Sequence, residues 1–534
     1  MLRMDRWRWA AMVAIATMTL IALLKYRSPT VTSPVFVPPV SRARGLAHCL
    51  ISLLYANFAN CPESQVSKIP NTKADIGTSK FHLLLAASNQ HPRLCRAILS
   101  SALLGYPISV LSGWGKTDDL DAGISHLAKV RNVMRYLDTL PPSSDQDLVL
   151  MVDGYDVVFQ LPADVLIQRY FAVTAAADEA LATRFGEDYL RATPEESRPR
   201  ATVLFGPEKL CYPPNEARSG CWAVPTNTGL APDAYGPDDG TIEHMLNRWL
   251  NSGTVIGPVR DMKKVFNGTL KRIQDFYNPE DDWSKDSDQK YLSDLWGDQE
   301  YFRSVKELQL NNHTGTVLPG VGSTKAVPTR ELGQETEYHI GIDYKGELFQ
   351  TRAVFEHALD LVPFNNTDSQ GALSSWVTRN VTDHPDFKPY SVPLPANVIL
   401  SLKRLLMSIS QTLKAKPADM IPQLPLNMNV VTRKVHAIFH CTGPKEYLDD
   451  LWPKMWFYPY LRSLLDVAIR SQRTGRRISD TPVDGRKWIP AHPPSTNAGN
   501  NDVNALGAWT DLEGEWLEWG PLCGQYNHEI FGDQ

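Results

Sequence analysis

The stretch Leu148–Phe159, which reads LVLMVDGYDVVF, decides the fold of this chain. Its apolar run predicts a buried strand, and the carboxylates of Asp153 and Asp156 follow where the chain leaves the sheet. Buried carboxylates repel each other and are costly to desolvate. A divalent cation removes both costs, and open α/β sheets bind ligands beyond the carboxyl ends of their strands. The pair therefore indicates a metal site able to hold a phosphorylated ligand. The alternative is a helix N-cap and a surface acid.

Bulk composition is that of a globular protein. The chain has 534 residues, of which 43% are hydrophobic and 21% charged. This length suits about two to four average domains, or one large domain with insertions. The formal net charge of −5 does not favour nucleic acid as a partner.

The N-terminal region has the pattern of a membrane anchor. Arginines precede an apolar run at 9–24, which is slightly shorter than the about 20 residues of a typical span. We expect residues 1–27 to be a cytoplasmic tail and signal anchor, and residues 28–78 to be a stem. The protein would then be a single-pass type II membrane protein of the Golgi or endoplasmic reticulum, with its catalytic domain in the lumen. A cleaved signal peptide is the alternative.

Glycosylation sequons and cysteines agree with a lumenal body. The sequons begin at Asn267, Asn312, Asn365 and Asn380. Seven cysteines suit an oxidising compartment and leave at least one unpaired. Cys211 and Cys221 bracket a short loop and could close a disulfide ring, and Cys49 and Cys61 are a second candidate pair.

Strand and helix patterns alternate from Phe81 onward, which predicts an α/β fold with a mostly parallel sheet flanked by helices. The expected strands are 81–87, 108–111, 148–159, 202–205 and 435–439, and the expected helices are 92–104, 124–140, 163–192 and 287–305. Residues 244–250 are predicted to be a helix end. We expect one domain over 79–465 with insertions at about 163–245 and 383–430. Residues 466–534 are predicted to be a polar linker and a Trp-rich tail.

Several motifs in this order resemble the glycosyltransferase domain of the procollagen lysyl hydroxylases and, more distantly, the procollagen galactosyltransferases. VDGYDVV at 152–158 is similar to VDSYDVI of that family, and LFGPE…CYP at 204–213 to FSAE…CWP. Further matches are LNSG at 250–253, DQEYF at 298–302, LFQ at 348–350 and HCTGP at 440–444. The similarity extends from about Phe81 to about Tyr460, and we expect no lysyl hydroxylase catalytic domain within these 534 residues.

The resemblance implies a GT-A type nucleotide-sugar-binding fold, a nucleotide-sugar donor and a manganese ion. Asp153, Asp156 and His440 would hold the ion. Two carboxylates and an imidazole suit Mn²⁺, and the cation would neutralise the diphosphate as the sugar–phosphate bond breaks. The alternative for His440 is a strand-end histidine that bonds a loop backbone.

The resemblance also implies a set of donor-binding residues. Ala87 and Ser88 would contact the base or ribose, Lys129 the diphosphate or uracil side, and Lys445 a phosphate; Tyr155 would stack on the base, and Asn251, Ser252 and Gly253 would lie against the donor sugar or diphosphate. The alternatives are ordinary structural roles. Lys129 could be a solvated helix charge, Tyr155 could cover the sheet edge, and 251–253 could be a helix C-terminal turn.

Asp298 and Gln299 are the expected catalytic pair, with Asp298 bonded to the donor sugar or near the reacting centre. Here the chain departs from the family, because LWGD at 295–298 replaces a run of acidic residues. Asn-Ser-Gly-Thr at 251–254 also replaces Asn-Ser-Gly-Gly. Both changes fall where donor sugar and acceptor would meet.

The expected function is therefore metal-dependent transfer of a hexose, glucose or galactose, from a UDP-sugar to a protein or glycan hydroxyl. One alternative is a GT-A transferase that uses another donor. Another is an inactive GT-A-fold protein that acts as a lectin or scaffold. Donor hydrolysis that requires manganese would separate the enzyme from the binding protein.

Overall fold

The computed structural model describes residues 77–534 except 122–124, 312–322, 332, 368–372, 379–387, 476, 480, 496–504, 512–513 and 533–534. The predicted anchor and stem, Cys49 and Cys61, and the sequons at Asn312 and Asn380 lie outside the described residues. Within that part of the chain, no helix is long and apolar enough to cross a membrane. Asn267 is exposed on a helix and Asn365 is exposed in a loop.

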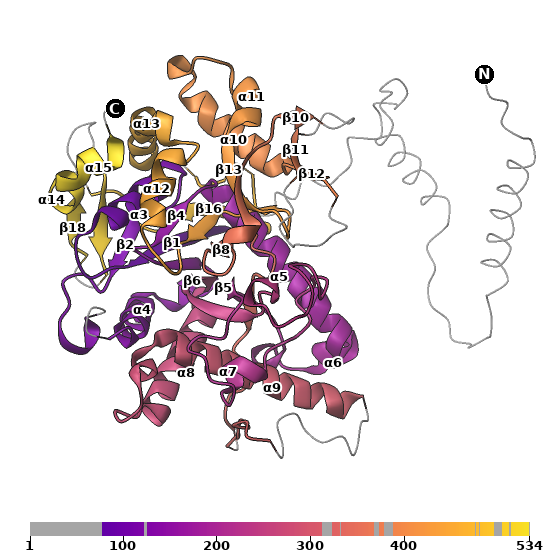
Figure 1. Ribbon diagram of the computed structural model, residues 1–534. Helices are drawn as coiled ribbons and strands as arrows, with labels where there is room; N and C mark the ends of the chain where they lie inside the picture. The colour runs from indigo at the N-terminus through magenta and orange to yellow at the C-terminus, as the bar shows by residue number, and fades with distance from the viewer. Residues whose placement is uncertain are drawn as a thin grey trace, which may run out of the picture. The chain divides into compact units, whose positions relative to one another are not determined.

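A mixed, mostly parallel sheet forms the centre of the α/β fold (Figure 1). Its nine strands run in the order β18-β17-β2-β1-β3-β6-β5-β7, with β16 also paired to β1. The pairs β17–β2, β2–β1, β1–β3, β1–β16 and β5–β7 are parallel, and β17–β18, β3–β6 and β5–β6 are antiparallel. The strands are β1 Thr78–Ala86, β2 Ser109–Ser112, β3 Leu148–Asp153, β5 Val203–Glu208, β6 Trp249–Pro258, β7 Ile340–Ile342, β16 Lys487–Pro490, β17 Gly507–Thr510 and β18 Trp516–Glu518.

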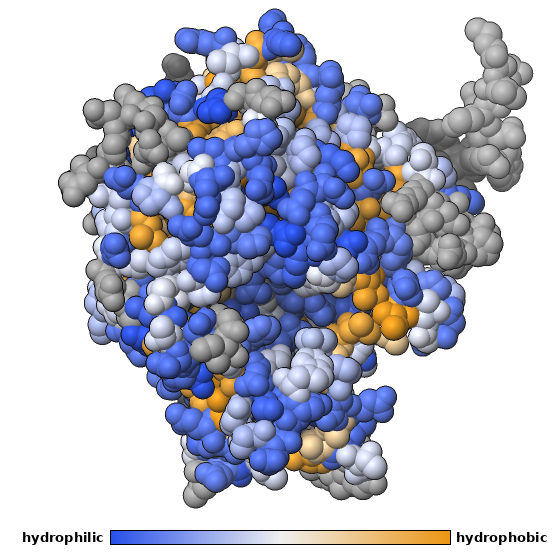
Figure 2. Space-filling view, turned by 60° about the vertical axis from the view of Figure 1, so that its left-hand side comes forward, coloured by the Kyte–Doolittle hydropathy of each residue, from blue (hydrophilic) through white to orange (hydrophobic). Residues whose placement is uncertain are grey.

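Alternate side chains of the central strands build a core on each face of the sheet. Leu83 and Leu85 of β1 join one core with helices α3 (Pro92–Leu103) and α13 (Leu461–Arg473). Leu84 points to the other core, which contains residues of α4 (Leu127–Thr139), α8 (Val259–Phe276) and α9 (Asp288–Leu310). Figure 2 shows one outer face, which is mostly hydrophilic with small, separate hydrophobic patches.

The stretch 148–159 forms two strands, where one was predicted. β3 ends at Asp153, and the chain turns and continues as β4 (Val157–Phe159) in a separate three-stranded sheet with β15 (Ile438–His440) and β8 (Phe349–Thr351). The turn packs closely against β1, since a Cβ on Gly154 would lie 2.9 Å from the carbonyl oxygen of Ala86. Since Val157 pairs with His440 across this small sheet, the break places both aspartates beside that histidine.

The predicted insertions are built as follows. Residues 163–192 are helical, as predicted, in α5 (Ala163–Phe185) and α6 (Glu187–Ala192). Residues 383–430 contain β12 (Tyr390–Pro393), α10 (Ala396–Ser408), α11 (Pro417–Met420) and β13 (Pro425–Asn429). β13 pairs with β9 (Leu359–Pro363) and β14 (Lys434–Val435), and β12 pairs with β11 (Leu373–Val377), which pairs with β10 (Asn366–Thr367). The helix end predicted at 244–250 is wrong, because a 3-10 turn at Ile242–His244 is followed by β6.

The prediction of a polar linker and tail over 466–534 is also wrong. β16 pairs with β1 and β17 with β2, so this region supplies strands of the central sheet. Figure 1 shows the yellow elements β18, α14 (Trp519–Cys523) and α15 (Asn527–Phe531) beside the indigo α3 and β2. Cys523 is disulfide-bonded to Cys95 of α3. Strands of three or four residues carry too little periodicity to be recognised among polar residues.

Candidate functional site

Asp153, Asp156 and His440 converge where β3, β4 and β15 meet. Each offers a ligand atom, and these atoms lie within 4.8 Å of one another. The Nε2 atom of His440 is 3.3 Å from Asp156 Oδ2 and 3.9 Å from Asp153 Oδ2. Asp156 and His440 are buried, whereas the Asp153 side chain is 30% exposed and leaves the cluster open to ligands. The structure thus brings together the predicted metal ligands.

Asn251 sets the orientation and tautomer of His440. The Asn251 Oδ1 atom accepts the N–H of Gly253 at 2.9 Å and lies 3.0 Å from His440 Nδ1. Nδ1 therefore donates to Asn251, and Nε2 faces the two carboxylates. An Nε2 atom that faces two carboxylates favours a cation at this point, and histidines that bind metals are held in this way through the other ring nitrogen.

The backbone beside the ligands leaves room for the cluster. A Cβ on Gly253 would lie 2.2 Å from His440 Cε1 and 2.7 Å from Asp153 Oδ2. Residues 251–253 are on strand β6, so the alternative of a helix C-terminal turn is wrong. Only glycine at 253 lets the imidazole and the carboxylate approach this strand.

Two lysines and a third carboxylate are the other charged groups of the site. Lys129 Nζ lies 2.9 Å from Asp153 Oδ1 and 2.6 Å from Asp288 Oδ2, and Lys445 forms an ion pair with Asp156. Three carboxylates against two ammonium groups leave one net negative charge, which a divalent cation would convert to one net positive charge. That charge would suit an anionic ligand such as a diphosphate.

The surrounding charges determine the protonation of Asp156 and Lys129. Burial alone would raise the pKa of Asp156, but His440 and Lys445 hold it below its usual range. Burial would lower the pKa of Lys129, but Asp153 and Asp288 raise it above its usual range. Lys129 is therefore a buried, charged member of the site, and the alternative of a solvated helix charge is wrong. The Oδ1 atom of Asp156 is buried with no hydrogen-bond partner among the described residues, so it is free to bind a cation.

Asp288 and Gln289 belong to this site and were missed from the sequence. Asp288 pairs with Lys129. The Oε1 atom of Gln289 lies 3.2 Å from the backbone nitrogen of Ser252 and 3.4 Å from its hydroxyl. The dipeptide Asp-Gln occurs both at 288–289 and at 298–299. Only the upstream copy follows several acidic residues, Asp281, Asp282 and Asp286. This difference could have identified Asp288 and Gln289 from the sequence.

The structure does not bring Asp298 and Gln299 to the cluster. Ten residues of α9 separate Asp298 from Asp288, or about 15 Å at 1.5 Å per residue. Asp298 forms an ion pair with Arg272 and accepts the Ser219 hydroxyl at 2.6 Å. Gln299 is fully buried and bonds the backbone at residues 338 and 340. Both side chains hold α9 against its neighbours, away from the cluster of Asp153, Asp156 and His440.

Ala87, Ser88 and Tyr155 lie together beside the ends of β1 and β3. The Tyr155 hydroxyl accepts the backbone N–H groups of Ser88 and Asn89, each at 2.9 Å, and donates to the Asn89 carbonyl at 3.1 Å. Ala87 is buried and donates its backbone N–H to Ser112 at 3.1 Å. Tyr155 therefore holds the loop after β1, and base stacking by its ring stays a prediction.

Glu208, at the end of β5, is a half-buried acid behind Asn251. The amide of Asn251 donates to Glu208 Oε1 at 2.8 Å. Burial raises the Glu208 pKa to about 7, although the Asn251 hydrogen bond acts in the other direction. Glu208 therefore keeps its proton to a higher pH in the folded chain than in the unfolded chain, where an exposed glutamate would ionise near 4.5.

Glu208 is expected to make the protein less stable as pH rises from about 4.5 to about 7. In this interval the folded state holds a proton that the unfolded state has released, so the slope of stability with pH is negative. The shift corresponds to about 3 kcal/mol. Glu208→Gln keeps an acceptor for Asn251 and should remove this loss. Urea unfolding of the unmodified chain and of Glu208→Gln at pH 4.5 and 7.5, in the presence of chelator, checks this expectation. Burial also raises the pKa of Asp343 to about 7, but Asp343 is present in both proteins, so its effect cancels in the comparison. Parallel pH profiles would contradict the assignment.

The predicted disulfide between Cys211 and Cys221 is confirmed. It closes the loop that follows Glu208, and Arg218 within it binds α9 through Lys290 O at 2.8 Å and Asp294 Oδ1 at 3.0 Å. The ring is therefore fixed to the helix that carries Asp288. Cys441, beside His440, is buried and free.

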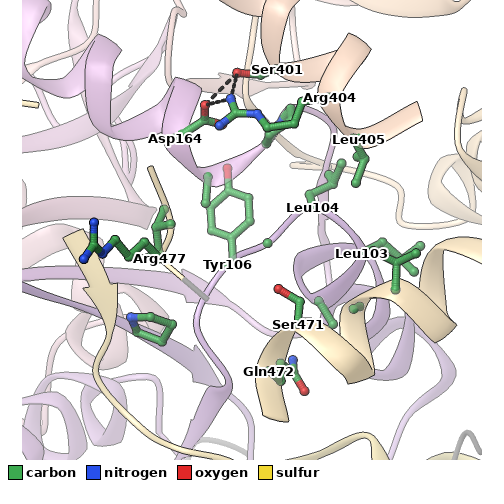
Figure 3. A pocket seen from close by; sticks show the side chains of 18 of the residues that line it. Leu103, Leu104, Tyr106, Asp164, Ser401, Arg404, Leu405, Ser471, Gln472 and Arg477 are labelled. Carbon is green, nitrogen blue, oxygen red and sulfur yellow. Dashed lines mark hydrogen bonds and ion pairs between the residues drawn. The ribbon is translucent and has the colours of Figure 1, made fainter. Parts of the chain in front are cut away.

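A pocket of about 110 Å³ lies at the other end of the sheet, between α3, α5, α10 and α13 (Figure 3). Asp164 accepts hydrogen bonds from Ser401 and Arg404 on its wall. Pro490, which also lines it, pairs with Phe81 near the start of β1, whereas the metal-ligand candidates follow the end of β3. This pocket is therefore separate from the candidate site.

Comparison with models of known protein families and with curated proteins finds no match for this chain.

Proposed function

We propose that the chain is a metal-dependent glycosyltransferase that moves a hexose from a UDP-sugar to a protein or glycan hydroxyl. The observation that carries the proposal is the convergence of Asp153, Asp156 and His440 at the carboxyl edge of a mostly parallel sheet. The GT-A type of this fold and the identity of the ion as Mn²⁺ belong to the proposal. So does a lumenal location on a membrane anchor, in the Golgi or endoplasmic reticulum.

The cation would neutralise charge on the diphosphate leaving group. Lys445 lies at the open side of the cluster with its side chain 37% exposed, and could exchange Asp156 for a phosphate oxygen once the cation is bound. Gly253 keeps the backbone close to the ligand, and Asn251 and Ser252 offer hydrogen bonds beside it. Lys129 holds Asp153 and Asp288 in place.

Asp288 and Gln289 would take the roles that we first expected of Asp298 and Gln299. With this assignment the chain agrees with the lysyl hydroxylase family, in which acidic residues precede the Gln, since Asp281, Asp282 and Asp286 precede Asp288 and Gln289. Asp288 lies at the first turn of α9, where its carboxylate can face donor-sugar hydroxyls or the reacting centre.

Asp288→Asn is expected to lower turnover at least about a hundredfold, because a carboxylate at the reacting centre acts through charge and position. Asp298→Asn is the matched change on the same helix, and should keep turnover per folded molecule within about twofold while lowering the melting temperature. Initial rates and thermal unfolding of both variants check this. Loss of turnover in Asp298→Asn alone would restore the first assignment.

One observation favours a second candidate, an inactive binding protein. Lys129 and Lys445 already pair with Asp153 and Asp156, so the fold tolerates the carboxylates without a cation. Acceptor-free hydrolysis of UDP-glucose and UDP-galactose separates the candidates. Hydrolysis that requires Mn²⁺ and stops in chelator supports the transferase. Well-folded protein that releases no UDP with either sugar would favour the binding protein.

A further inference from the structure

Two exposed aromatic rings stand side by side near the candidate site. Trp283 is 59% exposed and Tyr212 is 46% exposed, and their ring centroids are 5.6 Å apart. Four other tryptophans, at positions 296, 456, 488 and 519, are completely or almost completely buried. Exposed indole and phenol faces lose hydrophobic stabilisation, so such a pair indicates a binding surface.

Both rings are carried by segments that begin in the site. Tyr212 is four residues after Glu208, and Trp283 is five residues before Asp288. At about 3.5 Å per residue, neither ring is more than about 18 Å along the chain from the site. This is a distance that a short oligosaccharide spans.

Hydrogen bonds hold the two segments against one another. Arg218 ties the disulfide ring that contains Tyr212 to Lys290 and Ser293 of α9, both at 2.8 Å. The Asp282 side chain accepts the backbone N–H of Ser284 at 2.9 Å and so fixes the turn that bears Trp283. A rigid pair of rings binds a ligand with little loss of conformational entropy.

The carboxylates around Trp283 are already engaged by groups of the chain. Asp281 lies 3.4 Å from Lys290 Nζ, Asp282 caps the turn, and Asp286 accepts the Tyr277 hydroxyl at 3.4 Å. The hydrogen bonds of Asp282 and Asp286 position these carboxylates but leave their negative charge, so the surface offers aromatic faces with carboxylate acceptors beside them. This arrangement suits a sugar, whose apolar ring face stacks on an aromatic ring and whose hydroxyls donate to carboxylates. A cationic peptide is the competing class.

We propose that Tyr212 and Trp283 form a stacking platform for the glycan chain of the acceptor. The proposal deepens the function proposed above and rests on it. The platform would hold sugar units distant from the reacting hydroxyl, so that the acceptor terminus reaches the site beside Asp288. The acceptor class is then a glycan, in preference to a bare peptide.

Calorimetric titration of the full chain, without nucleotide or cation, tests the platform. The probes are maltohexaose, cellohexaose and mannohexaose, with hexalysine as the competing class. We expect at least one hexasaccharide to bind, and Trp283→Ala to weaken it about tenfold. Trp283→Phe, which keeps an aromatic face, should restore part of the affinity. Trp376→Ala is the matched control, since Trp376 is 54% exposed on β11 in another sheet.

Each outcome bears on the platform separately from catalysis. Binding of hexalysine alone, binding of none of the probes, or equal losses in Trp283→Ala and Trp376→Ala would overturn it. Glycan binding that depends on Trp283 supports it, even if the chain proves to hydrolyse no donor. Donor hydrolysis without any glycan binding would leave the proposed function standing and remove the platform.

Discussion

Replacing Asp156 by alanine is expected to abolish cation binding and to lower turnover at least about a thousandfold, since a catalytic metal supplies several kcal/mol of charge stabilisation. Asp156 is the buried carboxylate of the cluster, and its Oδ1 atom has no hydrogen-bond partner in the described part of the chain. Its Oδ2 atom lies 3.3 Å from His440 Nε2. Removing it leaves one partly exposed carboxylate and one imidazole, too few protein ligands for tight binding of a hard cation.

Manganese titration followed by calorimetry, together with initial rates, measures both effects. Asp164→Ala is a matched control, because Asp164 is also a buried aspartate paired with a basic side chain, Arg404, at the other end of the sheet. The control should bind manganese like the unmodified chain. Full turnover in Asp156→Ala, with the fold intact, would remove the metal assignment.

A chain that ends at residue 465 is expected not to fold. The truncation removes β16 and β17, which pair with β1 and β2 of the central sheet. It also removes the fully or almost fully buried side chains of Trp488, Trp519, Leu522, Ile530 and Phe531. At about 1.5–3 kcal/mol for each, these side chains contribute about 8–15 kcal/mol, which equals the whole stability of a typical domain.

Circular dichroism and thermal unfolding of the two lengths check this expectation. The matched variant is the full chain with Cys523→Ser, which keeps the strands and loses only the bond to Cys95. It should fold with stability lowered by about 2–4 kcal/mol. Cooperative unfolding of the truncated chain at an unchanged temperature would show that residues 466–534 are the dispensable tail first predicted.

The sequence predicts the fold best where apolar periodicity is strong. The strands at β1, β2, β3 and β5 and the helices α3, α4, α5 and α9 lie where the patterns placed them. The break at Gly154 was not foreseen, because an apolar run on both sides of a turn reads as one strand. The sequence predicts a helix end where β6 begins, since a ten-residue strand that starts with Trp, Leu, Asn and Ser has no clear period of two.

The candidate site shows the same division between local and tertiary information. Asp153 and Asp156 were predicted from the apolar run that carries them, and His440 was added because the resemblance to the lysyl hydroxylase glycosyltransferase domain implies it. Asp288 was missed because its partner, Lys129, is 159 positions away in the sequence and only the folded chain joins them. The pairing of Glu208 with Asn251, and the tautomer of His440 that depends on it, likewise require the register between β5 and β6.

The central claim is that Asp153, Asp156 and His440 hold a divalent cation that presents a nucleotide diphosphate. Its most direct test is thermal stabilisation of residues 45–534 by UDP-, GDP- and CMP-sugars, each with Mn²⁺ and with chelator. We expect UDP-sugars to raise the melting temperature only with Mn²⁺, and this increase to be lost in Asp156→Ala. A melting temperature that no nucleotide sugar changes, in well-folded protein with Mn²⁺ present, would contradict the claim.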